Sequence, residues 1–285
     1  MGVLRQVLLA AAKSDRVERA LSTIPTVRKL AGRYVAEDVA AAVADLSDRG
    51  LRVTVGRLGP EVLDRAQAEG AVRGYLALLD RLPEGSDVSV RLTVLGLRMS
   101  EQLALDNAAS LCEAAAGRGL TITLDAEEHD TVAGLHSVHA TLRKEHADVG
   151  VAVQAHLRDA EERCLRLDGA RVRLCKGAHT APGAFTTRKE VDRSFVRCLK
   201  ILMAGTGYPM VATHDPRLVE IASALAVLNG RDAAAFEYQM YYGVRPGEQE
   251  RLATLGAQLR VYVPHGTDWY PYLVRRLAFT GSPLP

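Results

Sequence analysis

The segment Leu259-Arg-Val-Tyr-Val-Pro-His-Gly-Thr-Asp-Trp-Tyr-Pro-Tyr-Leu-Val-Arg275-Arg276 contains the clearest strand-to-helix transition in the chain. Its first five residues, 259–263, are rich in β-branched and aromatic side chains, which is typical of a strand. A proline and a glycine then break the strand, and Thr267 or Asp268 can cap a new helix. The segment therefore predicts one strand followed at once by one helix.

The same strand-then-helix pattern recurs seven times before this segment. The predicted strands cover residues 51–56, 87–93, 120–125, 149–154, 170–175, 209–213 and 233–239. The helices predicted after them cover residues 60–82, 100–116, 132–145, 158–167, 189–204, 216–228 and 246–257. Alternating strands and helices indicate parallel strands with right-handed crossovers. Eight units in 285 residues predict an α/β fold, a closed (β/α)8 TIM-like barrel.

Residues 1–50 have a different pattern, with apolar side chains at helical spacing over residues 3–9, 17–21 and 35–46. We expect an N-terminal helical segment at 1–50. The barrel would occupy 51–285, including a C-terminal helix that lies over the barrel mouth.

Composition excludes several classes of protein. The net charge of +2 is too small to indicate a nucleic-acid partner. Four scattered cysteines without a Cys-x-x-Cys pair argue against structural zinc and against a disulfide framework, and no other metal motif stands out. No apolar run is long enough to span a bilayer. We expect a cytoplasmic protein whose membrane contact, if any, is peripheral at the inner face.

Polar residues cluster where the predicted strands end. They are Arg91, Asp125, Gln154, Arg173 with Lys176, Thr213 and His214, Glu237 with Gln239, and Tyr262. In a (β/α)8 barrel the carboxyl ends of the strands form the active-site face. Because this set is basic on balance, it favours a ligand that carries phosphates or a carboxylate.

Two adjacent arginines, Arg275 and Arg276, follow the eighth strand on the last predicted helix. Neighbouring helix positions point about 100° apart, so both can reach one anion only if the helix lies across a site. Two guanidinium groups can then enclose a carboxylate. Taken alone, an Arg-Arg pair favours a surface helix that carries two solvated arginines, and the other motifs along the chain are what favour a site.

Six motifs in order along residues 51–280 resemble the proline dehydrogenase family, which are flavoenzymes built on this barrel. The motifs are Leu124-Asp-Ala-Glu127, Val153-Gln-Ala155, Val172-Arg-Leu-Cys-Lys-Gly-Ala178, Ala212-Thr-His-Asp215, Phe236-Glu-Tyr-Gln-Met-Tyr-Tyr-Gly243, and Arg260-Val-Tyr-Val-Pro264 running on to Tyr272-Leu-Val-Arg-Arg276. Each motif alone is weak, whereas six in family order form a specific signal.

The resemblance implies FAD-dependent oxidation of L-proline to Δ1-pyrroline-5-carboxylate. A quinone would accept the electrons, and a separate pyrroline-5-carboxylate dehydrogenase would take the product. It implies catalytic roles for Asp125 and for Arg173 near flavin N5. It places Arg91, Tyr262, Tyr272, Arg275 and Arg276 around the substrate. The implied cofactor contacts are Ala126, Gln154, Arg173, Lys176, Gly177, Ala178, Thr213, His214 and Gln239.

Three positions depart from the family pattern. Arg91 and His179 stand where relatives have Lys and Tyr, and Tyr241 stands where many have Leu. These departures motivate one alternative, a non-catalytic relative that binds flavin or an amino acid. A second alternative is a barrel aldolase or lyase acting on a phosphorylated substrate, with Lys176 forming a Schiff base.

Overall fold

Eight parallel strands form a closed barrel in chain order, so the predicted fold class is confirmed. The computed structural model describes residues 23–24, 29, 31–60, 62–177 and 181–280, with side chains as far as Val274. The strands are β1 (Arg52–Leu58), β2 (Asp87–Val90), β3 (Thr121–Leu124), β4 (Gly150–Gln154), β5 (Arg171–Cys175), β6 (Tyr208–Ala212), β7 (Glu237–Tyr241) and β8 (Leu259–Gly266). The predicted helices at 3–9 and 17–21 lie outside the described residues.

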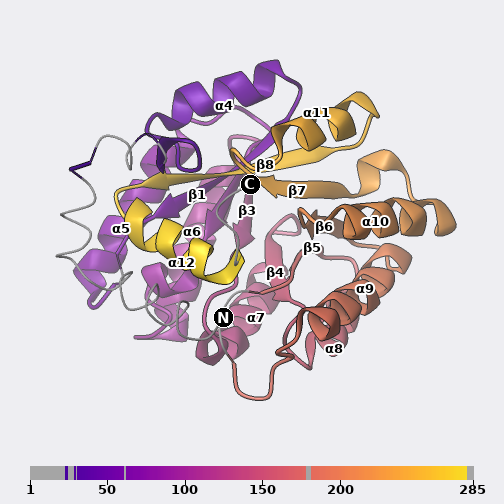
Figure 1. Cartoon of the computed structure of the whole chain (residues 1–285). Coiled ribbons are helices and arrows are strands. Elements are labelled where there is room, and N and C mark those ends of the chain that lie inside the picture. The colour runs from indigo at the N-terminus through magenta and orange to yellow at the C-terminus, as the bar shows by residue number, and fades with distance from the viewer. Residues whose placement is uncertain (1–22, 25–28, 30, 61, 178–180, 281–285) are drawn as a thin grey trace.

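Helices surround the barrel (Figure 1). They are α4 (Val39–Asp48), α5 (Arg65–Leu79), α6 (Glu101–Ala116), α7 (Val132–Leu142), α8 (Ala160–Arg166), α9 (Arg188–Ala204), α10 (Pro216–Leu228) and α11 (Pro246–Thr254), followed by α12 (Trp269–Thr280). Short 3-10 helices are η1 (Leu92–Leu95), η2 (His129–Thr131) and η3 (Ala233–Ala235). The main core lies between the strands and this ring, where outward residues such as Val53 and Val55 meet the helices.

The ring is completed by α4, a helix that precedes the first strand. Its buried residues, among them Val39 and Leu46, pack against β1 and β8. Arg49, at its end, pairs with Glu250 of α11 at 3.0 Å. In Figure 1, α4 lies beside α11, so it takes the place that a helix after β8 would otherwise fill. The predicted division at residue 50 stays a prediction.

The last helix, α12, turns back from the end of β8 (Figure 1). Leu273 packs into a small cluster with Tyr34, Val35 and Val244, against which Leu58 also lies. Leu58 ends β1 and Val244 follows β7, so this cluster lies at the carboxyl ends of the strands. The helix is therefore docked at the barrel mouth by apolar contacts.

Several predicted boundaries were wrong at strand ends. The predicted seventh strand began at 233, but Asp232 caps η3 there, with Ala234 N–H donating to its carboxylate at 2.7 Å. The second strand ends at Val90, because η1 starts two residues later. The eighth strand continues through Pro264, whose carbonyl accepts a hydrogen bond from Ala36 N–H at 2.8 Å.

Two helices also begin later than predicted. The helix predicted from 60 starts at Arg65, because the Asp64 side chain caps it by accepting from Gln67 N–H. The helix predicted from 35 starts at Val39, after the Asp38 cap. In both cases a short polar side chain that competes for backbone N–H groups fixes the first turn.

Candidate active site at the carboxyl ends of the strands

Polar side chains fill much of the barrel interior. Strand residues alternate between two faces, and Val88 and Val90 belong to the outer core. Asp87 and Ser89 between them therefore point inward, and both are buried. Barrel interiors are usually filled by branched apolar residues. Because burial of an unpaired polar group is costly, each polar group in this interior needs a hydrogen-bond or ion-pair partner.

Arg173 on β5 lies at the centre of this interior and is 4% exposed. Its guanidinium donates from Nε to Gln239 Oε1 at 2.7 Å, from Nη1 to Ser89 Oγ at 2.8 Å and from Nη2 to Asp87 Oδ2 at 3.1 Å. Asp125 Oδ1 lies 3.5 Å from Nη1. Burial lowers the pKa of Arg173, but the nearby Asp125 and Asp87 carboxylates outweigh it and raise that pKa. The arginine is thus a fixed positive charge.

Asp87 on β2 is fully buried and receives donors on both carboxylate oxygens. Thr121 and Thr123 donate to Oδ1 at 2.8 and 2.9 Å. Thr54 donates to Oδ2 at 2.9 Å, on the same oxygen as Arg173. Burial raises the pKa of Asp87, but Arg173 and then Arg260 hold it below its usual range. Asp87 is therefore a carboxylate at neutral pH.

A second buried ion pair lies at the start of β7 and β8. Arg260 Nε donates to Glu237 Oε1 at 2.7 Å, and the side chains are 3% and 0% exposed. Gln239 Nε2 also donates to Glu237 Oε1 at 2.7 Å, while its own oxygen accepts from Arg173. One continuous polar network therefore runs from Arg260 up to Arg173, with two buried carboxylates balancing two buried guanidinium groups.

Tyr262 lies over this network. Its ring centroid is 5.6 Å from Arg173 Cζ, and its hydroxyl donates to Asp125 Oδ2 at 3.5 Å. Burial, followed by the charges of Asp125 and Tyr241, raises the pKa of Tyr262 well above its usual value. The phenol is therefore neutral at pH 7 and can serve as a hydrogen-bond donor. Tyr272 of α12 lies close enough to add to the same pKa shift.

Tyr241 and His214 continue the aromatic wall. Tyr241 meets Tyr262 edge to face at 5.4 Å and stacks on His214 at 5.4 Å with an interplanar angle of 9°. His214 Nε2 accepts from Tyr241 N–H at 2.8 Å, so its ring proton is on Nδ1 when the ring is neutral. The side chain of His214 thus fixes the end of β7 as well as lining the mouth.

Gln154 ends β4 and holds one unused acceptor. Its Nε2 donates to Glu127 O at 2.9 Å, whereas its buried Oε1 has no hydrogen-bond partner among the described residues. Thr93 binds the Glu127 carboxyl through both N–H and Oγ. Burial raises the pKa of Glu127. Ala126, between the two acidic residues of its motif, is half-buried.

The turn after β5 contains Lys176 and Gly177. Lys176 Nζ lies 2.5 Å from Asp192 Oδ1 and 3.4 Å from Asp215 Oδ2. The Arg217 hydrogen bond, and then Lys176, lower the pKa of Asp215. Gly177 has φ +92°, and a Cβ there would lie 1.9 Å from His156 Nδ1, so only glycine fits this turn.

The remaining predicted residues divide into three groups. Thr213 is buried, and its Oγ1 accepts from Asp215 N–H at 3.2 Å. Arg91 lies beyond β2 rather than within it, and its Nη2 donates to Gly59 O at 2.8 Å. Ala178 and His179, as well as the side chains of Arg275 and Arg276, lie outside the described residues.

The sequence reasoning missed Asp87, Ser89 and the inward threonines. A usable signal was present, because polar residues alternate with apolar ones in Asp87-Val-Ser-Val90 and Thr121-Ile-Thr-Leu124. Such alternation in a strand that is covered by helices on its outer face indicates a polar barrel interior.

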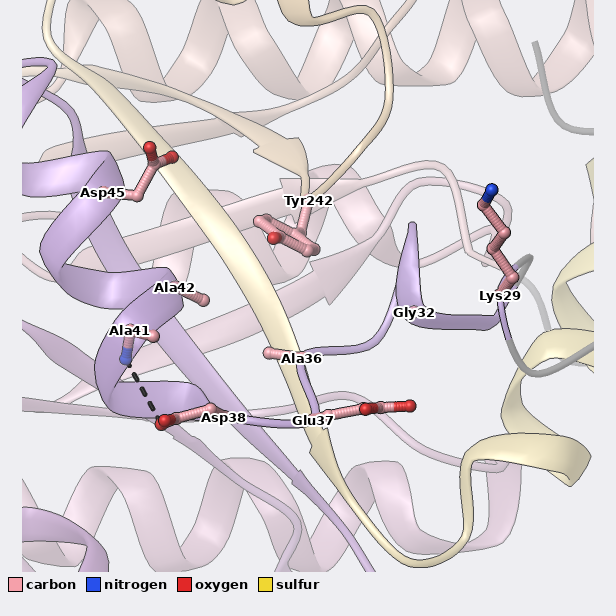
Figure 2. Close-up of a pocket in the computed structure, with 9 residues that line it drawn as sticks. All are labelled: Lys29, Gly32, Ala36, Glu37, Asp38, Ala41, Ala42, Asp45 and Tyr242. Atoms are coloured by element: carbon pink, nitrogen blue, oxygen red, sulfur yellow. Dashed lines mark hydrogen bonds between the residues drawn. The ribbon is translucent and has the colours of Figure 1, made fainter. Parts of the chain in front are cut away.

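A separate cavity of about 480 Å³ lies outside the barrel, between α4 and the segment before it. Figure 2 shows Tyr242 on one side of it and Asp38 and Asp45 on the other. None of the predicted site residues lines it. Asp38 is occupied as a helix cap, since its Oδ1 accepts from Ala41 N–H at 3.2 Å.

Comparison with known proteins gives consistent matches. The sequence profile of the family described as proline dehydrogenase matches residues 39–279. Proline dehydrogenase 1 of Bacillus subtilis is 31% identical over 287 residues, covering 97% of this chain and 95% of the relative. Proline dehydrogenase of Deinococcus radiodurans is 30% identical over 292 residues, with 97% and 94% covered.

Solved structures share the fold. Proline utilization A from Bdellovibrio bacteriovorus, inactivated by N-propargylglycine, superposes with a TM-score of 0.83 at 22% identity. The protein of the same name from Corynebacterium freiburgense gives 0.79 at 21% identity. Each match covers 96% of this chain but only 36% and 33% of the longer proteins, so the chain spans about a third of their length.

Proposed function

This chain belongs to the proline dehydrogenase family, and on that premise we propose that it oxidises L-proline to Δ1-pyrroline-5-carboxylate with FAD as cofactor and a quinone as electron acceptor. It is an oxidoreductase of proline catabolism. The observation that carries the proposal is Arg173, a buried and charged guanidinium held from three directions in the barrel interior, beside Asp125 and Tyr262.

The residues at the strand ends fit a flavin. The buried Oε1 of Gln154 is an acceptor in need of a donor, which the imide N–H of a flavin ring would supply. The turn at Gly177 brings backbone close to the mouth without a side chain. Arg173, Lys176 and Thr213, which belong to or follow β5 and β6, would help to hold the cofactor.

When bound, FAD supplies the two-electron acceptor that proline oxidation requires. Arg173 would stabilise the negative charge that the ring gains, and it is fixed in advance by Gln239, Ser89 and Asp87, so little reorganisation is needed. Tyr262, as a neutral phenol, donates to Asp125 and keeps that carboxylate beside Arg173.

We assign the proline carboxylate to α12. The helix continues through residues 275 and 276, one turn beyond Tyr272, which lies near Tyr262. Two arginines at these positions would form charge-assisted hydrogen bonds with a carboxylate. Tyr262, Tyr272 and Arg91 would then line the substrate.

The aldolase or lyase alternative has less support. A Schiff-base lysine needs an amine that is free to attack a carbonyl, whereas Nζ of Lys176 is engaged by the carboxylates of Asp192 and Asp215. The non-catalytic alternative differs from the proposal only in turnover, so an assay separates them.

None of the described helices is long and apolar enough to cross a bilayer. The proposed product is an imine, which calls for a separate enzyme that oxidises pyrroline-5-carboxylate.

The test uses purified protein before and after addition of FAD. The proposal predicts a yellow protein with a flavin absorption band that L-proline bleaches without oxygen, and proline-dependent reduction of an artificial electron acceptor. A protein that takes up no FAD would overturn the proposed cofactor. Flavin that is bound but never bleached by proline would favour the non-catalytic reading instead.

A further inference from the structure

We propose that Asp87 is a positioning residue for the reaction, because its carboxylate fixes the Arg173 guanidinium beneath the cofactor and offsets part of its charge, which lowers the reduction potential of the bound flavin. The inference rests on the proposed function. It concerns a residue on β2 that is deep in the barrel and has no part in the motifs.

The contact is direct and selective. Asp87 Oδ2 accepts from Arg173 Nη2 at 3.1 Å, and the two side chains are 0% and 5% exposed. The other two guanidinium nitrogens bind Ser89 and Gln239, which are neutral. Asp87 is therefore the fully buried anion in contact with Arg173, whereas Asp125, at 3.5 Å, is 27% exposed.

Burial makes this pairing electrostatically important. Charges interact more strongly where water is excluded, and a buried carboxylate beside a cation reduces the positive field that a neighbouring group experiences. A flavin above Arg173 would be easier to reduce under the full field of the arginine. Removing the Asp87 charge should therefore shift the flavin potential to a more positive value.

The two oxygens of the Asp87 carboxylate have different hydrogen-bond donors. Thr121 and Thr123 donate to Oδ1, whereas Thr54 donates to Oδ2, the oxygen that also accepts from Arg173. A change at Thr54 alters the oxygen that touches the guanidinium, and a change at Thr121 alters only the support of the carboxylate. Variants of Thr54 and Thr121 can therefore be compared directly, because each removes one hydrogen bond to Asp87.

The experiment measures the midpoint potential of the FAD-loaded protein for wild type and Asp87→Asn. Ser89 and Gln239 still hold Arg173 in the variant. We expect a positive shift of potential, with the melting temperature also reduced. Asp87→Glu, which restores the charge, should return the potential toward that of wild type.

Glu237→Gln is the comparison, since it removes an equally buried carboxylate that pairs with Arg260 and reaches Arg173 only through Gln239. If Asp87 serves stability alone, both variants lower the melting temperature and neither moves the potential. A shift in Asp87→Asn no larger than that in Glu237→Gln overturns the inference.

If Asp87→Asn yields no folded protein, the midpoint potential is measured for Thr54→Val and Thr121→Val instead. Loss of the Thr54 hydroxyl removes the donor that shares Oδ2 with Arg173, so the potential should fall. In Thr121→Val the other oxygen, Oδ1, still accepts from Thr123, so the potential should change less. Equal potentials in the two variants overturn the inference. Failure of wild type to bind FAD or respond to proline would instead count against the proposed function.

Discussion

The Tyr262 hydroxyl occupies the space that a side chain at Gly56 would need. A Cβ built on Gly56 would lie 2.1 Å from that oxygen and 2.4 Å from Cζ of the ring. The two residues lie on the neighbouring strands β1 and β8. The phenol over the mouth therefore depends on the absence of a side chain on β1.

Gly56→Ala should displace the Tyr262 ring from Asp125 and Arg173. Overpacking of this kind costs about 1–3 kcal/mol, so we expect kcat/KM for proline to fall by about tenfold. Gly247→Ala is the control, because nothing lies within 4 Å of a Cβ at that helical position. Unchanged kinetics in Gly56→Ala would show that the position of the phenol is unimportant.

Arg173→Lys should lower kcat/KM for proline by about 100-fold or more, as loss of a preorganised electrostatic group does in other enzymes. Lysine keeps the charge but cannot reach Gln239, Ser89 and Asp87 together. The control is Arg171→Lys, two residues earlier on the same strand, where the guanidinium lies over Tyr208. Equal losses in both variants would point to a general defect of β5.

Arg275→Met and Arg276→Met should each raise the KM for proline by about 30-fold or more. Loss of one partner from a charge-assisted contact costs about 2–5 kcal/mol. FAD content should stay at the wild-type level. Arg65→Met, at the exposed start of α5, should behave like wild type. A normal KM in both α12 variants would remove the carboxylate from this helix.

Stability should fall on acidification because of His139. Burial lowers its pKa from 6.5 to about 4, and its Nε2 donates to Val149 O at 3.2 Å. In the unfolded chain His139 therefore binds a proton near pH 6.5, whereas in the folded chain it binds one only near pH 4. The unfolding free energy should drop by about 3 kcal/mol across that window.

His139→Gln keeps an N–H donor without the titration, so denaturant unfolding at pH 7 and pH 4 should show a smaller pH dependence. His129→Gln, at an exposed histidine, is the comparison for the substitution itself. His136, whose pKa is also lowered to about 4 by burial, contributes in the same direction.

Arg231→Met should lower the unfolding free energy by about 2–4 kcal/mol. The guanidinium of Arg231 donates to five carbonyl oxygens, those of Leu202, Met203, Gly205, Gly207 and Ala235. It thereby satisfies the end of α9. Arg98→Met removes an exposed arginine that pairs with Asp130 and Glu128 and should cost less than about 1 kcal/mol. Chemical denaturation compares the two.

The sequence was sufficient for the barrel because each strand and helix had a local signal. Val149-Gly-Val-Ala-Val-Gln154 has the β-branched pattern of a buried strand, and β4 covers Gly150–Gln154. The predicted ends of helices and strands were wrong where one capping side chain determines the first residue of a helix. Asp232 and Asp64 act through one cap hydrogen bond each, and several neighbouring residues could have served.

The candidate site was predicted in part. Arg173, Asp125, Gln239 and Tyr262 come from four different strand regions, yet each lay toward the end of a predicted strand, and the barrel brings them together. Asp87 could not be paired with Arg173 from the sequence, because 86 positions separate them and only strand register defines the contact. The dual role of His214 likewise depends on how β6 and β7 align.

The use of α4 to close the ring has an evolutionary consequence. In an ordinary barrel the helix after β8 covers the outer face of the sheet, so it must keep apolar residues on the side that packs against the strands. Here α4, which precedes β1, covers that part of the sheet, so the sequence of α12 can diverge without exposing the strands. On the proposed role of α12 in binding the proline carboxylate, changes in this helix would alter the range of substrates while the barrel stays constant, and exchange of α12 between relatives would be a direct route to new imino-acid selectivity.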